Sequence, residues 1–229
     1  MRQGYWKTHK YKRHSVERDV DDFIGWPKLQ EMLKDGRERD KVFASVAFET
    51  GGRVSEVRAL HRNNFILINP KVILVTKMQV LKRFHREFDQ ETGEKKVVKD
   101  IVYRKTFPIK RNEPLAVIML KWIEDSDGWL FPTDRGDEAY LGRTMSYNIA
   151  RRLGDNIGMW IYPHWFRAQR ASQLRIEYGF DTLDLMEFFA WEDVKTATRY
   201  AKMGWQGLAA CAKGAMLVAD QMVKRVKPD

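Results

Sequence analysis

The chain has 229 residues, a length that suits one sizeable domain with its own core and short attached segments. Its 41 lysines and arginines exceed the 31 aspartates and glutamates, and the net charge of +10 favours a polyanionic partner. A hydrophobic fraction of 44%, with 12% aromatic residues, is far above that of a disordered basic protein and excludes a histone-like tail.

Residues 1–24 are predicted to form a basic arm outside the core. The first 14 residues include five cations and no acid, with three aromatic residues between them, so no core can form there unaided. The five cations are Arg2, Lys7, Lys10, Lys12 and Arg13. We expect these side chains to contact the polyanionic partner.

Residues 25–204 are predicted to form the main domain, which begins with helices. Apolar residues recur at helical spacing from Trp26 onward, and the same pattern returns over residues 42–47. Two successive glycines then end the second helix, and a short third helix is expected over residues 54–60.

Strands are expected next. Residues 65–68 and 72–75 are rich in β-branched and aromatic side chains and are separated by Asn-Pro, which predicts a hairpin. Residues 78–104 are dense in charge of both signs and are predicted to form a long β-hairpin or flap. An extended strand is expected to resume at residues 106–109.

Helices are predicted to dominate after residue 110. They are expected over residues 115–123, 144–153 and 163–178, and a proline opens the last of them, where it forfeits no hydrogen bond. Residues 129–132 are predicted to form a buried extended piece. The fold class is therefore mainly α with a small antiparallel β-sheet.

The C-terminal segment 205–229 carries apolar side chains at steps of three and four residues, which predicts an amphipathic helix. This helix can dock on its own domain or exchange with a neighbouring protomer.

The cysteine content and the hydropathy pattern indicate the cellular compartment. Cys211 is the single cysteine, so no internal disulfide can form, and a reducing compartment is expected. The five histidines show no metal-binding pattern. No stretch approaches the roughly 18 apolar residues of a membrane span, and the N-terminus lacks a signal-peptide run. We expect a cytoplasmic protein with no membrane partner.

Two short motifs carry candidate chemistry. TGGRVSEV places Arg53 after two glycines, where the backbone can bend sharply, and Glu56 follows on the same helical face. PHWFR places His164 and Arg167 three residues apart at a helix start, where backbone amides also favour an anion. Two guanidiniums and an imidazole suit a phosphate group.

A third motif pairs Trp191 with Tyr200, nine residues later. On one continuous helix this spacing would put the two side chains on opposite faces. They can share a site only if Trp191 precedes the helix, and Glu192 or Asp193 is a suitable starting residue.

In this order, the three motifs resemble those of the tyrosine recombinase (phage integrase) family, including its Xer-like and archaeal or viral integrases. The resemblance covers roughly residues 26–202 and implies the catalytic-domain fold of that family. It assigns Tyr200 as the nucleophile and Glu56 as the acidic residue that orients the site. Arg53 resembles the first catalytic arginine of the family, His164 and Arg167 resemble its His-x-x-Arg pair, and Trp191 resembles the residue that is His or Trp in the family. It also implies that no metal or cofactor is required.

The family uses a further lysine in a turn between two strands, and two candidates remain open. Lys77 ends the second predicted strand, 24 residues beyond Arg53, and Lys82 is its competitor. The long segment that follows Lys77 departs from the usual tight turn of the family.

The resemblance implies a site-specific recombinase or integrase that cleaves and rejoins DNA through a 3′-phosphotyrosyl link. A phenol ionises far above neutral pH, so Tyr200 needs a base or neighbouring cations, and His164 is the candidate base. Arg53 and Arg167 can hold the charge of the transition state, and Trp191 can only donate from its indole nitrogen. The lysine can protonate the leaving 5′ oxygen.

The expected partner is double-stranded DNA, on which the protein self-associates as a dimer to a tetramer. Lys82 and Arg83 of the flap are expected to join the arm in binding it. Family members usually carry an N-terminal clamp domain, and the residues before Trp26 are too few to build one. We therefore expect either a catalytic fragment or a minimal recombinase that clamps DNA with its arm and flap, encoded by a prokaryotic host, a virus or a plasmid.

Two alternatives stay open at the level of sequence. One is a DNA-binding protein that keeps the fold without catalysis. The other is a type IB topoisomerase-like enzyme, which relaxes supercoils with related residues but no synapsis.

Overall fold

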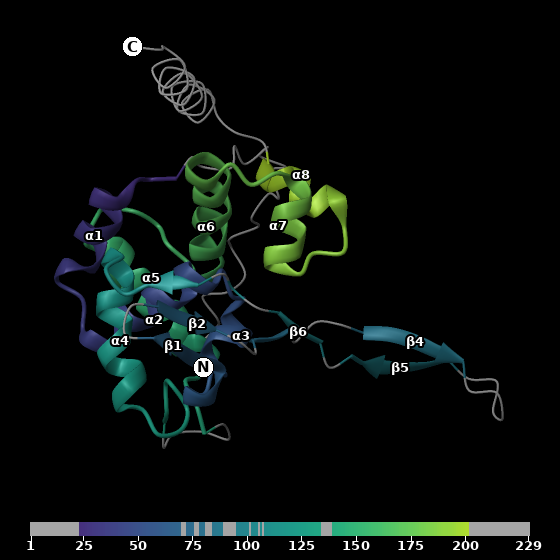
Figure 1. Ribbon diagram of the computed structural model, residues 1–229. Coiled ribbons are helices and arrows are strands. Elements are labelled where there is room, and N and C mark those ends of the chain that lie inside the picture. The colour runs from purple at the N-terminus through teal and green to yellow at the C-terminus, as the bar shows by residue number, and fades with distance from the viewer. Residues whose placement is uncertain are drawn as a thin grey trace, which may run out of the picture.

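Helix α2 (Glu38–Thr50) is buried along most of its length, and several of the other helices pack around it (Figure 1). The computed structural model describes residues 23–201 except 70–71, 76–77, 81–83, 89–94, 101, 105, 107 and 134–138. Most of the predicted arm, the predicted helix 205–229 and the flap cations Lys82 and Arg83 therefore lie outside the described residues.

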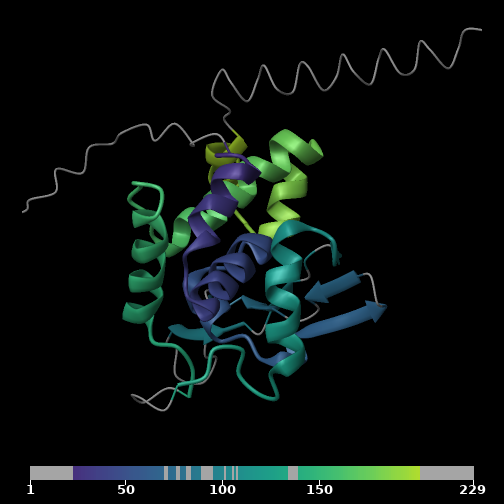
Figure 2. The same cartoon turned by 90° about the vertical axis from the view of Figure 1, so that its left-hand side faces the viewer.

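The described helices follow the apolar periodicity of the sequence. Apart from α2 they are α1 (Trp26–Lys34), α3 (Val54–Arg58), α4 (Pro114–Asp125), α5 (Arg143–Asp155), α6 (Pro163–Tyr178), α7 (Thr182–Phe189) and α8 (Val194–Ala201). A 3-10 turn, η1 (Arg62–Asn64), links α3 to the first strand. Figure 2 shows α2 between α4 and α5, and α2 also packs against α6.

The strands form three small antiparallel sheets. Strands β1 (Phe65–Asn69), β2 (Val72–Val75) and β7 (Ile109–Lys110) lie in the order β1-β2-β7. The other two are two-stranded: β3 (Met78–Val80) pairs with β6 (Val102–Arg104), and β4 (Phe84–Phe88) pairs with β5 (Lys95–Lys99). The β4–β5 ribbon extends well away from the helical body in Figure 1.

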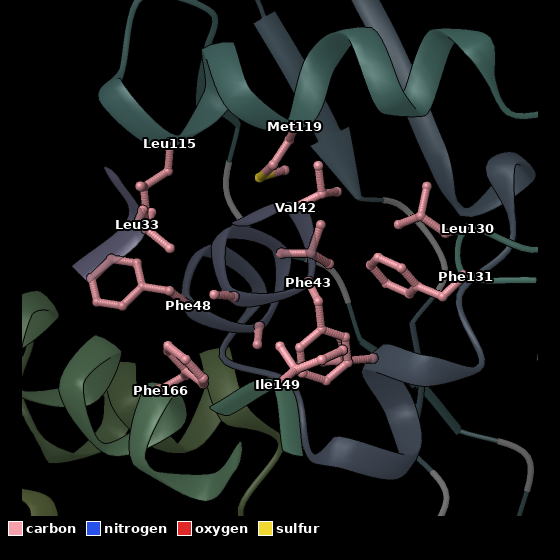
Figure 3. Close-up of a cluster of buried hydrophobic side chains, with 14 of the residues drawn as sticks. Leu33, Val42, Phe43, Phe48, Leu115, Met119, Leu130, Phe131, Ile149 and Phe166 are labelled. Carbon is pink, nitrogen blue, oxygen red and sulfur yellow. The ribbon is translucent and has the colours of Figure 1, made fainter. Parts of the chain in front are cut away.

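Two hydrophobic cores hold the helices together. In the larger one, side chains from α1, α4, α5 and α6 surround those of α2, and Phe43 meets Phe131 edge to face at 5.4 Å (Figure 3). The smaller core joins α6, α7 and α8 around Phe189 and Trp191. The smaller core connects α7 and α8 to α6, and through α6 to the larger core.

The expected fold class, mainly α with a small antiparallel sheet, is confirmed. Helix α7 is an element that was not predicted from the sequence. It begins after Asp181, whose side chain accepts hydrogen bonds from two backbone amides. The strand expected over residues 106–109 is wrong in its bounds, because among the described residues of this segment the pairing with β2 is made by Ile109 and Lys110.

A buried ion pair links α2 to α6. Glu49 and Arg170 are both almost completely buried, and their carboxylate oxygen and guanidinium nitrogen lie 3.1 Å apart. Arg170 also donates to Gln173. Burial raises the pKa of Glu49 from the ordinary 4.5 to about 6, and the nearby charge of Arg170 offsets only part of this effect.

This raised pKa gives a test of the buried pair. Because the pKa of Glu49 is higher in the folded protein than in the unfolded chain, the folded state holds the proton more tightly and gains stability at low pH. This gain in unfolding free energy is lost as the pH rises through about 6. Between pH 5 and 7, urea denaturation should therefore show the wild type losing about 1 kcal/mol of unfolding free energy relative to Glu49→Gln, which cannot titrate. Glu124→Gln, in an exposed ion pair with Arg111, is the control and should leave the pH dependence unchanged. If the difference in unfolding free energy between wild type and Glu49→Gln stayed constant from pH 5 to 7, the raised pKa of Glu49 would be contradicted.

Candidate active site

The site is built around the turn between α2 and α3. Gly51 ends α2 in the left-handed conformation, with φ of 57°, which a glycine adopts without strain. The chain then bends, and Arg53 lies at the residue before the first turn of α3. Its backbone amide donates to Glu56 Oε2, and its Nη1 donates to Glu56 Oε1, both at 2.8 Å.

Glu56 is buried, and its charge is shared among several cations. Burial alone would raise the pKa of this carboxyl, but Arg104, the Arg53 amide, and the guanidiniums of Arg167 and Arg53 together hold it below the ordinary value. Glu56 is thus a carboxylate that orients Arg53, whose side chain is 24% exposed. Arg53 is the guanidinium of this cluster that reaches the surface.

Arg104 is a site residue that no sequence motif identified. It lies in β6, and its guanidinium donates to the carbonyl oxygens of Thr50 and Phe188 and approaches Glu56 Oε2 at 3.8 Å. Burial lowers its pKa to about 10, against the opposing effect of Glu56. In the sequence it is one of many cations of the flap, and no local pattern marks it as buried.

Arg167 is completely buried on the inner side of α6. It donates from Nη1 to the Gly51 carbonyl at 2.5 Å and from Nη2 to the Phe189 carbonyl at 3.0 Å. Its guanidinium lies 4.6 Å from the Phe189 ring centroid and 5.2 Å from that of Trp191. In this structure Arg167 therefore holds backbone carbonyls together behind the surface, and does not project from it.

Trp191 lies in the loop between α7 and α8, the placement that a site shared with Tyr200 requires. Its ring stacks on Phe189 at 4.5 Å with an interplanar angle of 18°. Asp193 then starts α8 by accepting from the backbone amide of Lys195. The indole packs mainly in the smaller core, with 7% of the residue exposed.

Of the remaining predicted residues, His164 and the backbone of Tyr200 are described by the structure. His164 is exposed in the first turn of α6, three residues before Arg167. The backbone of Tyr200 lies in α8, one helical turn after the buried Ala197. Lys77, directly before β3, is outside the described residues, as are its competitor Lys82 and the arm cations.

The structure thus brings the Arg53–Glu56 pair together with Arg167 and Trp191, which lie more than 100 residues later in the sequence. Among the residues that the structure describes, no three His, Cys, Asp or Glu side chains are grouped so that they could hold a metal ion. Within the same residues, no helix is both long enough and apolar enough to span a membrane.

Comparison with protein families gives one match, to the model of the phage integrase family, over residues 26–204. The chain belongs to the phage integrase family. Comparison with curated protein sequences gives no significant match.

Solved structures of tyrosine recombinases share the fold. The XerH recombinase bound to its difH substrate in a pre-cleavage complex has a TM-score of 0.54 and 15% identity over 85% of this chain and 55% of that one. XerA recombinase has a TM-score of 0.52 and 16% identity, over 90% of this chain and 64% of that one. The Tn1549 transposon integrase (residues 82–397) in complex with circular intermediate DNA has a TM-score of 0.52 and 17% identity, over 82% of this chain and 64% of that one. The chain spans less than two thirds of each of these proteins.

The close contact between Gly51 and Phe189 allows a test of the site. A Cβ on Gly51 would overlap the Phe189 ring, whereas a Cβ on Gly179, which also ends a helix at positive φ, would meet nothing within 4 Å. Backbone strain alone should cost Gly179→Ala about 1–2 kcal/mol of unfolding free energy. Gly51→Ala should cost about 1–3 kcal/mol more, because Phe189 and its contacts with Arg167 and Trp191 must shift. Equal losses in urea denaturation would mean that this contact does not constrain the site.

Proposed function

We propose that the protein is a site-specific DNA recombinase that cleaves and rejoins DNA strands through Tyr200. The observation that carries this proposal is the meeting of Arg53, Glu56, Arg167 and Trp191 at the ends of α2 and α7. Helix α8, whose sequence contains Tyr200, packs against α6 and α7 beside this cluster. Family membership supports the same activity.

In the proposed reaction, the phenolic oxygen of Tyr200 attacks the phosphorus of a phosphodiester, and the bond to the 5′ oxygen breaks. His164 accepts the phenolic proton, and Lys77 or Lys82 gives a proton to the departing 5′ oxygen. The product is a 3′-phosphotyrosyl bond and a free 5′ hydroxyl. Attack by the 5′ hydroxyl of a second strand reverses each step and rejoins the DNA.

The guanidiniums have separate tasks in this reaction. Arg53 is partly exposed and held by Glu56, so it can present two donors to the nonbridging oxygens of the phosphate. Arg167 supplies positive charge close behind the same turn and fixes the carbonyls of Gly51 and Phe189. Charge stabilisation by such preorganised donors is usually the largest contribution to catalysis of this kind.

Duplex DNA is the proposed partner, and the net charge of +10 supports it. XerH and the Tn1549 integrase, which share the fold, are each described in complex with DNA. We propose that the arm cations, with Lys82 and Arg83, bind the duplex backbone and that two to four copies assemble on it. Transfer of a mobile element or viral genome is the proposed setting.

The nucleophile is tested with a nicked duplex, whose site is first selected from a random-sequence pool by binding to the wild type. The wild type should form a covalent adduct visible on a denaturing gel. Tyr200→Phe should bind the duplex equally well and form no adduct, because only the attacking oxygen is lost. Tyr178→Phe, at the exposed end of α6, is the matched control and should form the adduct normally.

The other outcomes separate the alternative functions. Binding without any adduct in the wild type would indicate a DNA-binding protein without catalysis. An adduct with supercoil relaxation, but no strand exchange between two duplexes, would indicate a topoisomerase-like enzyme.

The choice between the two lysines is tested with a substrate that carries sulfur at the bridging 5′ position. Such a leaving group departs without protonation, so it should restore cleavage by the variant that lacks the general acid. We expect Lys77→Ala to be rescued and Lys82→Ala to show no selective rescue. Rescue of Lys82→Ala alone would transfer the role to Lys82.

A further inference from the structure

Arg104 ties together three separate parts of the site. One NH2 group donates to the Phe188 carbonyl near the end of α7 at 3.1 Å, and the other donates to the Thr50 carbonyl at the end of α2 at 2.8 Å. The second group also contacts Met78 Sδ at 2.8 Å and lies 3.8 Å from Glu56 Oε2. Only 4% of the residue is exposed.

The strand pairing places this side chain at the base of the extended ribbon. Arg104 of β6 is directly opposite Met78 of β3, and Met78 is fully buried. Lys77, a candidate general acid, directly precedes Met78 in the chain. Arg104 thus connects the strand after Lys77 to the carboxylate that orients Arg53.

A guanidinium is suited to this task, because its planar donors can satisfy two carbonyls and a carboxylate at once. Its burial is costly, since desolvation of a charged group is not fully repaid. An apolar side chain at this position would leave the Thr50 and Phe188 carbonyls without donors and Glu56 without a neighbouring cation. The contact with Glu56 is the one that links Arg104 to Arg53.

We propose that Arg104 is a positioning residue for DNA strand cleavage, which holds Glu56, and through it Arg53, against the base of the ribbon. This role rests on the proposed recombinase function. It does not require Arg104 to touch DNA. The groups that face Glu56 are Arg53 from the start of α3, Arg104 from β6 and Arg167 from α6.

The test compares Arg104→Met and Arg104→Lys with Arg170→Met. Arg170 is the matched control, because it is a similarly buried arginine whose ion-pair and hydrogen-bond partners Glu49 and Gln173 do not contact Glu56 or Arg53. It meets the site at the Phe188 ring, 6.0 Å from its guanidinium. On the nicked duplex at saturating concentration, Arg104→Met should cleave about 100-fold more slowly than the wild type, with unchanged DNA affinity. Arg104→Lys should retain intermediate activity, and Arg170→Met should cleave at the wild-type rate per folded molecule.

A second measurement does not depend on cleavage. In protein without DNA, ¹³C NMR of labelled glutamate should show the pKa of Glu56 rising in Arg104→Met and rising less in Arg104→Lys. Arg170→Met should leave it unchanged. The pH at which cleavage falls on the acid side should rise in the same order, because a carboxyl that loses a neighbouring cation protonates more readily.

The outcomes separate this inference from the proposed function. If the wild type forms no adduct, the proposed function fails, and the NMR measurement still decides whether Arg104 holds Glu56. An unchanged pKa of Glu56 in both Arg104 variants would overturn the inference even if the wild type cleaves DNA. Equal cleavage by Arg104→Met and Arg170→Met would also overturn it. Failure of both Arg104 variants to fold, while Arg170→Met folds, would assign a purely structural role.

Discussion

The last carbonyl groups of an α-helix have no partner within the helix, and two helix ends of this kind meet at the centre of the site. Two buried arginines satisfy them in parallel. Arg104 bonds the carbonyls of Thr50 in α2 and Phe188 in α7, and Arg167 bonds those of the next residues, Gly51 and Phe189. The cations also lie at the negative ends of the two helix dipoles. The relative position of α2 and α7 therefore depends on two guanidiniums, each of which spans both helix ends.

This arrangement explains why the surrounding residues are so constrained. The two cations need a nearby anion, and Glu56 supplies it while it also fixes Arg53 at the surface. The Phe189 ring lies against both the Arg167 guanidinium and Trp191, and Gly51 leaves room for it. The turn after α2, the start of α3 and the loop after α7 thus form one connected unit.

The sequence predicted the parts of this unit that follow local rules. Arg53 and Glu56 are three residues apart at the start of a short helix. A site shared by Trp191 and Tyr200 requires a helix start between them, and Asp193 provides it. Arg104 could not be found in this way, because its partners Thr50 and Phe188 are 54 and 84 residues away. Its burial depends on tertiary packing, and its neighbours in the sequence are exposed or charged.

Helix α7 was missed for a related reason. Its eight residues are few for a periodic signal, and its apolar side chains are buried only because α6 and α8 pack beside it. The capping aspartate was the local signal that could have revealed it. By contrast, the long helices around α2 carry enough apolar periodicity to be predicted from sequence alone.

The β4–β5 ribbon extends away from the helical body (Figure 1), and none of its described residues belongs to either hydrophobic core. The described β3 and β6 contribute buried Met78, Val80 and Arg104, whereas Phe88 and Val97 farther out are exposed (Figure 1). A change in the length of this ribbon alters the closure entropy of a loop only slowly and leaves the described core residues in place. The β4–β5 ribbon can therefore change in length and composition at little cost to the described core, while the centre held by Arg104 and Arg167 keeps its contacts.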